Sequence, residues 1–113
     1  MNLAIIGGTG LDEMPEFASG RERVVSTRFG DALVIESERD GGGLVFLPRH
    51  GTGHGVPPSL INYRANMAAL KKLGIERVIG VCAVGSLKTE ITAGSFVVLG
   101  DFIDLTKRRV DTF

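Results

Sequence analysis

Short apolar runs that end at glycine mark out the first elements of the chain. Residues 2–6, 44–47 and 77–83 are mostly apolar, and runs of this length with few polar positions predict strands. The run at 2–6 is followed by Gly7-Gly8-Thr9-Gly10, so we expect a buried strand that enters a tight turn.

Two further strands are predicted to form hairpins. Residues 24–27 and 32–36 lie on either side of Phe29-Gly30-Asp31, which can make a turn. The three glycines at 41–43 predict a hairpin loop before the strand at 44–47.

The hydrophobic period changes to that of a helix after a loop rich in glycine and proline, residues 50–58. We predict Ser59 as the N-cap and Gly74, which follows Lys71-Lys72, as the C-terminal stop. The apolar face of this helix is predicted to consist of Ile61, Met67, Ala68 and Leu70.

Residues 95–99 predict another strand, which residues 102–105 extend. The order of elements favours an α/β fold with a mixed central sheet and flanking helices. A single long helix leaves part of the sheet uncovered, and the sequence stops at Phe113 soon after a strand. We therefore expect the fold to be incomplete at its C-terminus and completed by further sequence or by a partner chain.

Composition narrows the class of protein. The 113 residues include 43% hydrophobic side chains, which is enough for one domain with a core and too many for a disordered chain. Thirteen basic and thirteen acidic residues balance, so we expect no binding to nucleic acid. No apolar run is long enough to span a bilayer and no export signal is visible, so a cytoplasmic protein that does not bind membranes is predicted. The single cysteine excludes an internal disulfide, and no metal-ligand spacing is present.

The glycine-rich turn at 7–10 is a candidate anion site, because backbone N–H groups can converge there and Thr9 adds a hydroxyl. A dinucleotide site is an alternative, although the third glycine of its motif is missing and Met14-Pro15 interrupts a helix early. A third interpretation of these residues is a junction between a strand and a turn that binds no ligand.

Two other predicted strand ends carry candidate groups. Arg49 offers a planar fork for phosphate oxygens and His50 can donate or accept a proton, but Arg49 pairing with a carboxylate is an equal alternative. Cys82 begins a stretch of small residues that leaves room for a ligand, while its sulfur is more typical of a buried hydrophobe than of a nucleophile. Ligands of α/β sheets bind outside the carboxyl ends of strands, so we expect Thr9, Arg49 and Cys82 to form one anion pocket.

Several motifs, taken together and in order, resemble a known family. They are Ile5-Ile6-Gly7-Gly8-Thr9-Gly10-Leu11, Pro48-Arg49-His50-Gly51, His54, Pro57-Pro58, Asn62-Tyr63-Arg64-Ala65-Asn66 and Ala83-Val84-Gly85-Ser86-Leu87. With these motifs the chain resembles the 5′-methylthioadenosine phosphorylases and, more widely, the trimeric purine nucleoside phosphorylases.

The resemblance implies phosphorolysis of a purine nucleoside, with 5′-methylthioadenosine or 5′-methylthioinosine as the expected substrate. The products are the free base and (5-methylthio)ribose 1-phosphate. Inorganic phosphate is a co-substrate, and neither a metal nor an organic cofactor is expected. By position in the motifs, the phosphate-binding residues are expected to be Thr9, Arg49, His50, Cys82 and Ala83. The nucleoside-binding residues are expected to be Ala83, Val84 and Gly85; no catalytic residue is assigned.

The same resemblance implies that residues 1–113 are the N-terminal part of a single nucleoside phosphorylase domain, which assembles as a homotrimer. Family members are much longer, and their purine-reading groups lie outside the matching motifs. Two other hypotheses remain open: a dinucleotide-binding module, and an inactive fragment that needs a second half.

Overall fold

The computed structural model describes residues 2–8, 10–11, 13–37, 43–107, 109–110 and 112–113, with the side chain of His54 outside this description. The chain divides into two units, Met1–Cys82 with Phe113 and Ala83–Thr112, which are described separately. All helices and strands of the described residues belong to the first unit.

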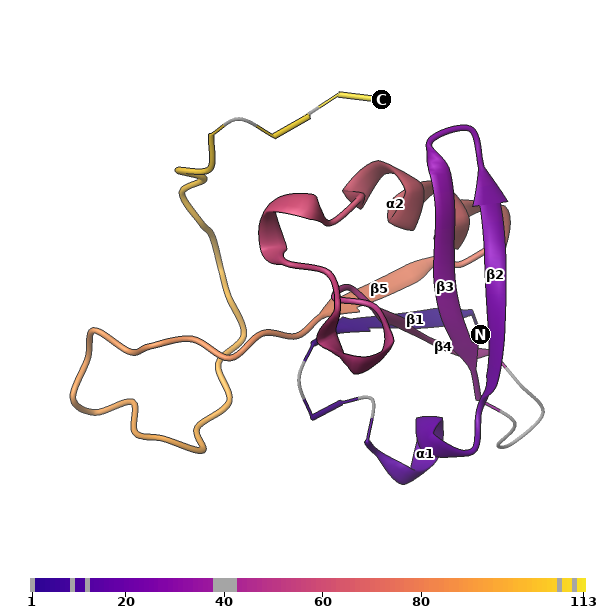
Figure 1. Ribbon diagram of the computed structural model, residues 1–113. Coiled ribbons are helices and arrows are strands. Elements are labelled where there is room, and N and C mark those ends of the chain that lie inside the picture. Colours follow the sequence, from indigo (N-terminus) through magenta and orange to yellow (C-terminus); the bar gives the residue numbers. More distant parts are fainter. Residues whose placement is uncertain (1, 9, 12, 38–42, 108, 111) are drawn as a thin grey trace. The chain divides into compact units, whose positions relative to one another are not determined.

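The first unit is built on a five-stranded mixed sheet with the order β2-β3-β4-β1-β5 (Figure 1). Strands β4, β1 and β5 are parallel, whereas β2 and β3 are antiparallel to their neighbours. This arrangement confirms the expected α/β fold with a mixed central sheet. The strands are β1 (Leu3–Gly7), β2 (Arg21–Thr27), β3 (Gly30–Glu36), β4 (Leu44–Pro48) and β5 (Arg77–Gly80).

Strand β4 is covered on both faces, which explains its unbroken apolar sequence. Val45 and Leu47 belong to the core cluster beneath helix α2 (Tyr63–Lys72). Phe46 points to the opposite face and stacks on Phe17 of the short helix α1 (Pro15–Ala18), with ring centroids 4.9 Å apart. Alternating side chains of one strand therefore hold a helix against each face of the sheet.

Helix α2 begins three residues later than the sequence predicts. Ser59 lies in the 3-10 turn η3 (Pro58–Leu60), and the N-cap is Asn62, whose Oδ1 accepts from the Ala65 N–H at 3.1 Å. Pro57 and Ile61 are extended, with ψ angles of 154° and 124°, so the helix cannot start between them. The predicted N-cap at Ser59 is wrong.

The C-terminal stop of α2 is as predicted. Gly74 adopts a φ of 70° and donates its N–H to the Lys71 carbonyl at 3.0 Å. This left-handed conformation carries little strain in glycine and ends the helix.

The buried face of α2 consists of Ala65, Ala69 and Leu70. Met67 is 42% exposed, so its predicted place in the core is wrong. The helical period puts residue 67 about 200° from residues 65 and 69, on the side away from the sheet.

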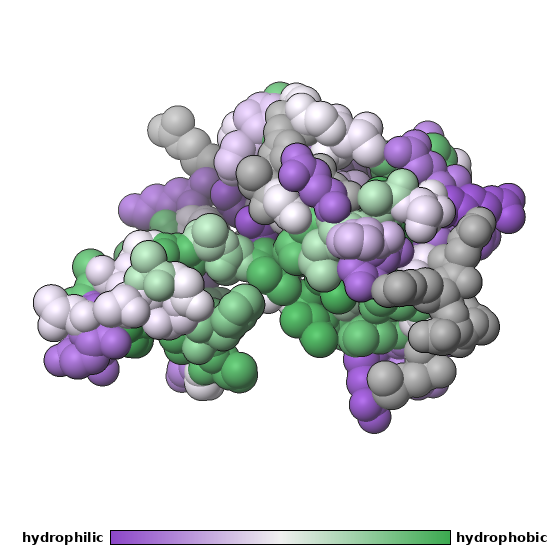
Figure 2. Space-filling view, turned by 90° about the horizontal axis from the view of Figure 1, so that it is seen from below, coloured by the Kyte–Doolittle hydropathy of each residue, from purple (hydrophilic) through white to green (hydrophobic). Residues whose placement is uncertain are grey.

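The second unit contains none of the strands predicted for it. Residues 95–99 and 102–105 have no regular structure, and β5 ends at Gly80 rather than at residue 83. A strand needs a neighbour to hydrogen-bond with its backbone, and no ladder to either stretch is found in the described part of the chain. Phe96 is therefore 99% exposed and Ile103 85% exposed; Figure 2 shows apolar residues, in green, on the surface of the molecule.

Candidate anion-binding site

The ends of three parallel strands meet at one edge of the sheet, the carboxyl ends of β1, β4 and β5 (Figure 1). The Arg49 N–H, just after β4, donates to the Gly7 carbonyl of β1 at 3.0 Å. The Val81 N–H, just after β5, donates to the Ile6 carbonyl at 2.8 Å. These bonds bring the start of the glycine-rich turn, Arg49 and Val81 side by side.

The Arg49 side chain is held by both of its neighbours at this edge. Its Nη1 donates to the Val81 carbonyl at 3.1 Å, and its Nε donates to His50 Nε2 at 3.2 Å. Its Nη2 lies against Gly8, because a Cβ built on that glycine would be 3.4 Å from it. The guanidinium therefore lies between the first glycine turn and the end of β5.

His50 links Arg49 to the following loop, which contains the 3-10 turn η2 (Thr52–His54). Its Nδ1 is 3.0 Å from the Val56 carbonyl. With Nε2 accepting from Arg49, Nδ1 is the ring nitrogen left to bond with the Val56 carbonyl. The ring packs close to Gly8, where a built Cβ would be 3.2 Å from His50 Cδ2.

The charge of Arg49 is not balanced by an acidic side chain within the described residues. The salt bridge found there joins Arg23 and Glu36 at 2.8 Å, on strands β2 and β3. The carboxylate partner considered for Arg49 is therefore not seen in the described part of the chain. A half-buried guanidinium beside a glycine turn suits an anion, which would accept charge-assisted hydrogen bonds.

The structure brings together only part of the predicted phosphate and nucleoside residues. Arg49 and His50 are in contact, and the free, exposed Cys82 directly follows Val81. Thr9 lies outside the described residues. Ala83, Val84 and Gly85 belong to the second unit, whose placement against the first is not described.

Two residues that position the site were missed by the sequence analysis. Val56 and Val81 act through their carbonyl oxygens, which accept from His50 and Arg49. Any residue type supplies a carbonyl, so no side-chain signal could have identified them.

The geometry after β1 does not match a dinucleotide site. Such a site places the pyrophosphate at the N-terminus of a long helix that directly follows the glycine turn. Here the next helix is α1, which has four residues and begins only at Pro15.

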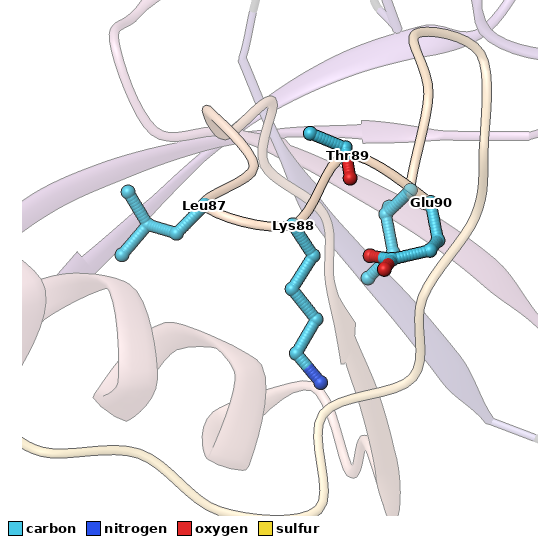
Figure 3. Close-up of a pocket in the computed structure, with 5 residues that line it drawn as sticks. Leu87, Lys88, Thr89 and Glu90 are labelled. Carbon is cyan, nitrogen blue, oxygen red and sulfur yellow. The ribbon is translucent and has the colours of Figure 1, made fainter.

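A hollow in the second unit is no alternative site. Its lining is one loop segment, residues 87–91 (Figure 3). Leu87 and Lys88 point in different directions in this view, and the lining residues are neighbours along a single segment. Within the described residues, no group of three potential ligands could hold a metal ion, and no helix is long and apolar enough to cross a membrane.

Comparison with known proteins decides the family. A model of the phosphorylase superfamily matches residues 2–113. The chain belongs to this superfamily. The expected relation to purine nucleoside phosphorylases is confirmed by the relatives described next.

These phosphorylase relatives are similar over nearly the whole chain. A probable 6-oxopurine nucleoside phosphorylase of Dictyoglomus turgidum is 49% identical over 114 residues, which cover 100% of this chain and 43% of that protein. A probable S-methyl-5′-thioinosine phosphorylase of Methanocaldococcus jannaschii is 46% identical over 112 residues, covering 98% of this chain and 42% of that protein.

A solved phosphorylase structure has the same fold in this region. The methylthioadenosine phosphorylase from Schistosoma mansoni in complex with adenine superposes with a TM-score of 0.88 at 43% identity, covering 100% of this chain and 42% of that one. The chain thus spans less than half the length of the phosphorylases that it matches.

Proposed function

We propose that the whole protein catalyses phosphorolysis of a purine nucleoside, most simply 5′-methylthioadenosine or 5′-methylthioinosine. The observation that carries this proposal is the Arg49 guanidinium, held between Gly8 and the Val81 carbonyl at the carboxyl ends of three parallel strands. An arginine fixed there can hold inorganic phosphate in one orientation. The relatives named for purine nucleoside and thioinosine phosphorolysis support the substrate class.

In the proposed reaction a phosphate oxygen attacks C1′ of the nucleoside as the glycosidic bond breaks. The purine leaves with the bonding electron pair and takes up a proton, and (5-methylthio)ribose 1-phosphate remains. Positive charge develops on the ribose in the transition state. A phosphate anion fixed close to the ribose stabilises that charge, so the protein acts by positioning and electrostatics.

Arg49 is the proposed clamp on the phosphate, with His50 beside it. We extend the phosphate site to Thr9, Cys82 and Ala83. The ribose and base are proposed to lie along Ala83, Val84 and Gly85. Cys82 is a weak donor, so its contribution is assigned to its backbone.

Turnover by the complete protein tests this proposal. With inorganic phosphate present, we expect base release from 5′-methylthioadenosine or 5′-methylthioinosine, with inosine and adenosine as comparison substrates. Release that requires phosphate supports phosphorolysis. No release from any of the four nucleosides would contradict it.

The oligomeric state and the location of the protein are also proposed. We infer a homotrimer that works in cytoplasmic purine salvage, in keeping with the family that the sequence motifs resemble. Light scattering on the complete protein measures the oligomer, and a monomeric or dimeric mass would contradict the trimer.

A further inference from the structure

Four cationic side chains gather where the turn of the β2–β3 hairpin meets helix α2 (Figure 1). Arg28 lies in the turn, and Arg64, Lys71 and Lys72 lie on the helix. The guanidinium carbons of Arg28 and Arg64 lie over the Phe29 ring, 4.6 Å and 5.1 Å from its centroid. We call these four cations the basic patch; because the whole sequence has no net charge, the patch is a local excess.

The period of α2 explains how three of the cations come to share one side of the helix. Residues 64, 68, 71 and 72 lie within about 100° of one another around the helix axis. One stripe of α2 therefore carries Arg64, Lys71 and Lys72, with the small Ala68 between them. Lys72 Nζ donates to the Ser26 carbonyl at 3.1 Å, which ties the last turn of the stripe to the hairpin.

A hollow of about 650 Å³ opens between the hairpin and this stripe. Apolar and cationic side chains both line it, among them Phe29, Ala68, Arg28, Lys71 and Lys72. A ligand there can pack on apolar surface while its negative groups meet the cations.

No acidic side chain of the described residues is found to neutralise the patch. Helix α2 (Tyr63–Lys72) has no acidic residue. On the hairpin, Asp31 is the acidic residue nearest the turn, but its neighbour Ala32 packs in the core beneath α2. Because side chains alternate along a strand, Asp31 lies on the opposite face of the sheet. The ion pair found in the described part of the chain, Arg23 with Glu36, includes no residue of the patch.

We propose that the basic patch binds an extended acidic segment of a partner protein. From Arg64 to Lys72 the helix rises by about 12 Å, and four residues of extended peptide cover about 13 Å. Alternate side chains of an extended peptide point the same way, so acidic residues at alternate positions reach both ends of the patch. A single phosphate or carboxylate group meets one end only.

The stacking on Phe29 suits the two arginines to carboxylates. A guanidinium that lies over a ring keeps the N–H groups at its edge free for a carboxylate. The ring also restricts the two long side chains before a partner binds, which reduces the entropy lost on binding. This proposal does not depend on the proposed phosphorolysis.

Binding of a synthetic peptide to the complete protein tests the proposal. The probe is a fluorescein-labelled peptide in which glutamate alternates with glycine, and the readout is fluorescence anisotropy. We expect binding that weakens as sodium chloride is added, because salt screens exposed charges. The matched peptide with glutamine in place of glutamate should not bind, and equal binding of the two peptides would overturn the proposal.

Two double variants locate the peptide on the protein. Arg28→Ala with Lys71→Ala removes one cation from each end of the patch, and neither side chain has a hydrogen bond or ion pair among the described residues. We expect the dissociation constant of the peptide to rise about tenfold. Arg21→Ala with Arg23→Ala is the control, because it removes the same charge from the far end of the hairpin. It should change the constant by about twofold at most, and an equal loss in both variants would overturn the proposal.

The Arg49→Ala variant separates the patch from the anion site at the strand ends. It should bind the peptide as the unaltered protein does, whether or not the protein carries out phosphorolysis. Loss of peptide binding in Arg49→Ala would place the peptide at the strand ends and overturn the proposal. Displacement of the peptide by an equal concentration of inorganic triphosphate would indicate a site for phosphorylated ligands, and would also overturn it.

The complete protein is the right sample because the chain itself is a competing occupant of the patch. Phe113, the last residue of the sequence, meets the Phe29 ring edge-on with centroids 5.6 Å apart. The relatives that the chain matches are more than twice as long. An absence of peptide binding would mean that the rest of the chain or another subunit covers the patch, and would overturn the proposal.

Discussion

The Arg49 guanidinium is held in place by the Val81 carbonyl and the His50 ring, and no ion pair with an acidic side chain is found for it within the described residues. A carboxylate partner would have to be displaced, or would repel an incoming anion. Fixing a cation without a carboxylate leaves its charge available to a ligand. At the scale of single residues, the lack of an acidic partner among the described residues is what suits Arg49 to an anion.

Replacement of Arg49 by alanine tests its role. Arg49→Ala in the complete protein should raise the KM of phosphate or lower kcat, with a loss of about 2–4 kcal/mol in transition-state stabilisation, because a charge-assisted contact with phosphate is removed. Steady-state kinetics with varied phosphate measure this.

Arg23 provides the matched control. It belongs to an exposed ion pair with Glu36 on β2 and β3, so Arg23→Ala should change stability by about 1 kcal/mol at most and leave phosphate kinetics unaltered. If the two variants have the same phosphate dependence, Arg49 has a structural role only.

Gly8 is the second residue with a specific requirement. A Cβ there would lie 3.2 Å from His50 Cδ2 and 3.4 Å from Arg49 Nη2, so Gly8→Ala should displace one of them. We expect the KM of phosphate to rise by about fivefold or more, corresponding to about 1 kcal/mol.

Gly55 is the matched control for Gly8, since a Cβ there meets nothing within 4 Å among the described residues. Gly55→Ala should leave the KM of phosphate within about twofold of its original value. An unchanged KM in Gly8→Ala would mean that Arg49 and His50 tolerate a closer neighbour than their packing indicates.

At the scale of elements, the start of α2 also fastens the β2–β3 hairpin. Asn62 Oδ1 caps the helix at the Ala65 N–H, while its Nδ2 donates to the Phe29 carbonyl in the hairpin turn at 2.7 Å. The guanidinium carbon of Arg64 lies over the Phe29 ring, 5.1 Å from the centroid of that ring. One amide thus sets both where the helix begins and where the hairpin turn lies.

Two substitutions of Asn62 separate the contribution of the helix cap from that of the hydrogen bond to Phe29. Asn62→Ala removes the cap and the hairpin bond and should lower the free energy of unfolding by about 2 kcal/mol, about 1 kcal/mol for each. Asn62→Ser keeps a cap but cannot reach Phe29, so it should lose about half as much. Denaturant unfolding measures both variants, and equal losses would show that the hairpin bond dominates.

Most of the sheet could be predicted from local pattern, and the failures have physical causes. Strand β4 was predicted because its apolar run reflects cover on both faces. The first residues of β2, Arg21-Glu22-Arg23, were missed because exposed edge positions carry charges. The start of α2 was placed at Ser59 because the extended backbone at Ile61 leaves no mark on the hydrophobic period.

The site was predictable only where it depends on side chains. Arg49 and His50 were found from their types and their place after an apolar run. That Arg49 bonds to Val81, 32 positions away, depends on strand order, which no local pattern encodes. The carbonyl that bonds to His50 Nδ1 belongs to Val56, an ordinary apolar residue.

At the scale of the whole molecule, the two units differ in kind. The first has a core on both faces of a sheet, whereas the second exposes side chains as large as Phe96 and Phe102. A segment so rich in apolar residues is unlike a solvated tail in composition. Its sequence predicts strands that find no partner in the described chain.

Hydrogen exchange on the 113-residue chain tests this contrast. Amides of β1, β4 and α2 should be protected, because they are bonded within the sheet or the helix. Amides of residues 95–105 should exchange at rates typical of unstructured peptide. Protection of residues 95–99 would show that this stretch pairs as its sequence predicts.

The hydrogen bonds of Arg49 affect the stability of the folded protein as well as the binding of an anion. Its backbone N–H bonds to β1, its side chain bonds to the end of β5, and it follows β4 directly, so one residue ties together three strand termini. An anion that settles on its guanidinium reinforces the same junction. Folding and ligand uptake are then thermodynamically linked, and phosphate at about one hundred times its dissociation constant should stabilise the native protein by about 2.7 kcal/mol. Bound phosphate would in that sense act as a removable cross-link between the ends of three strands.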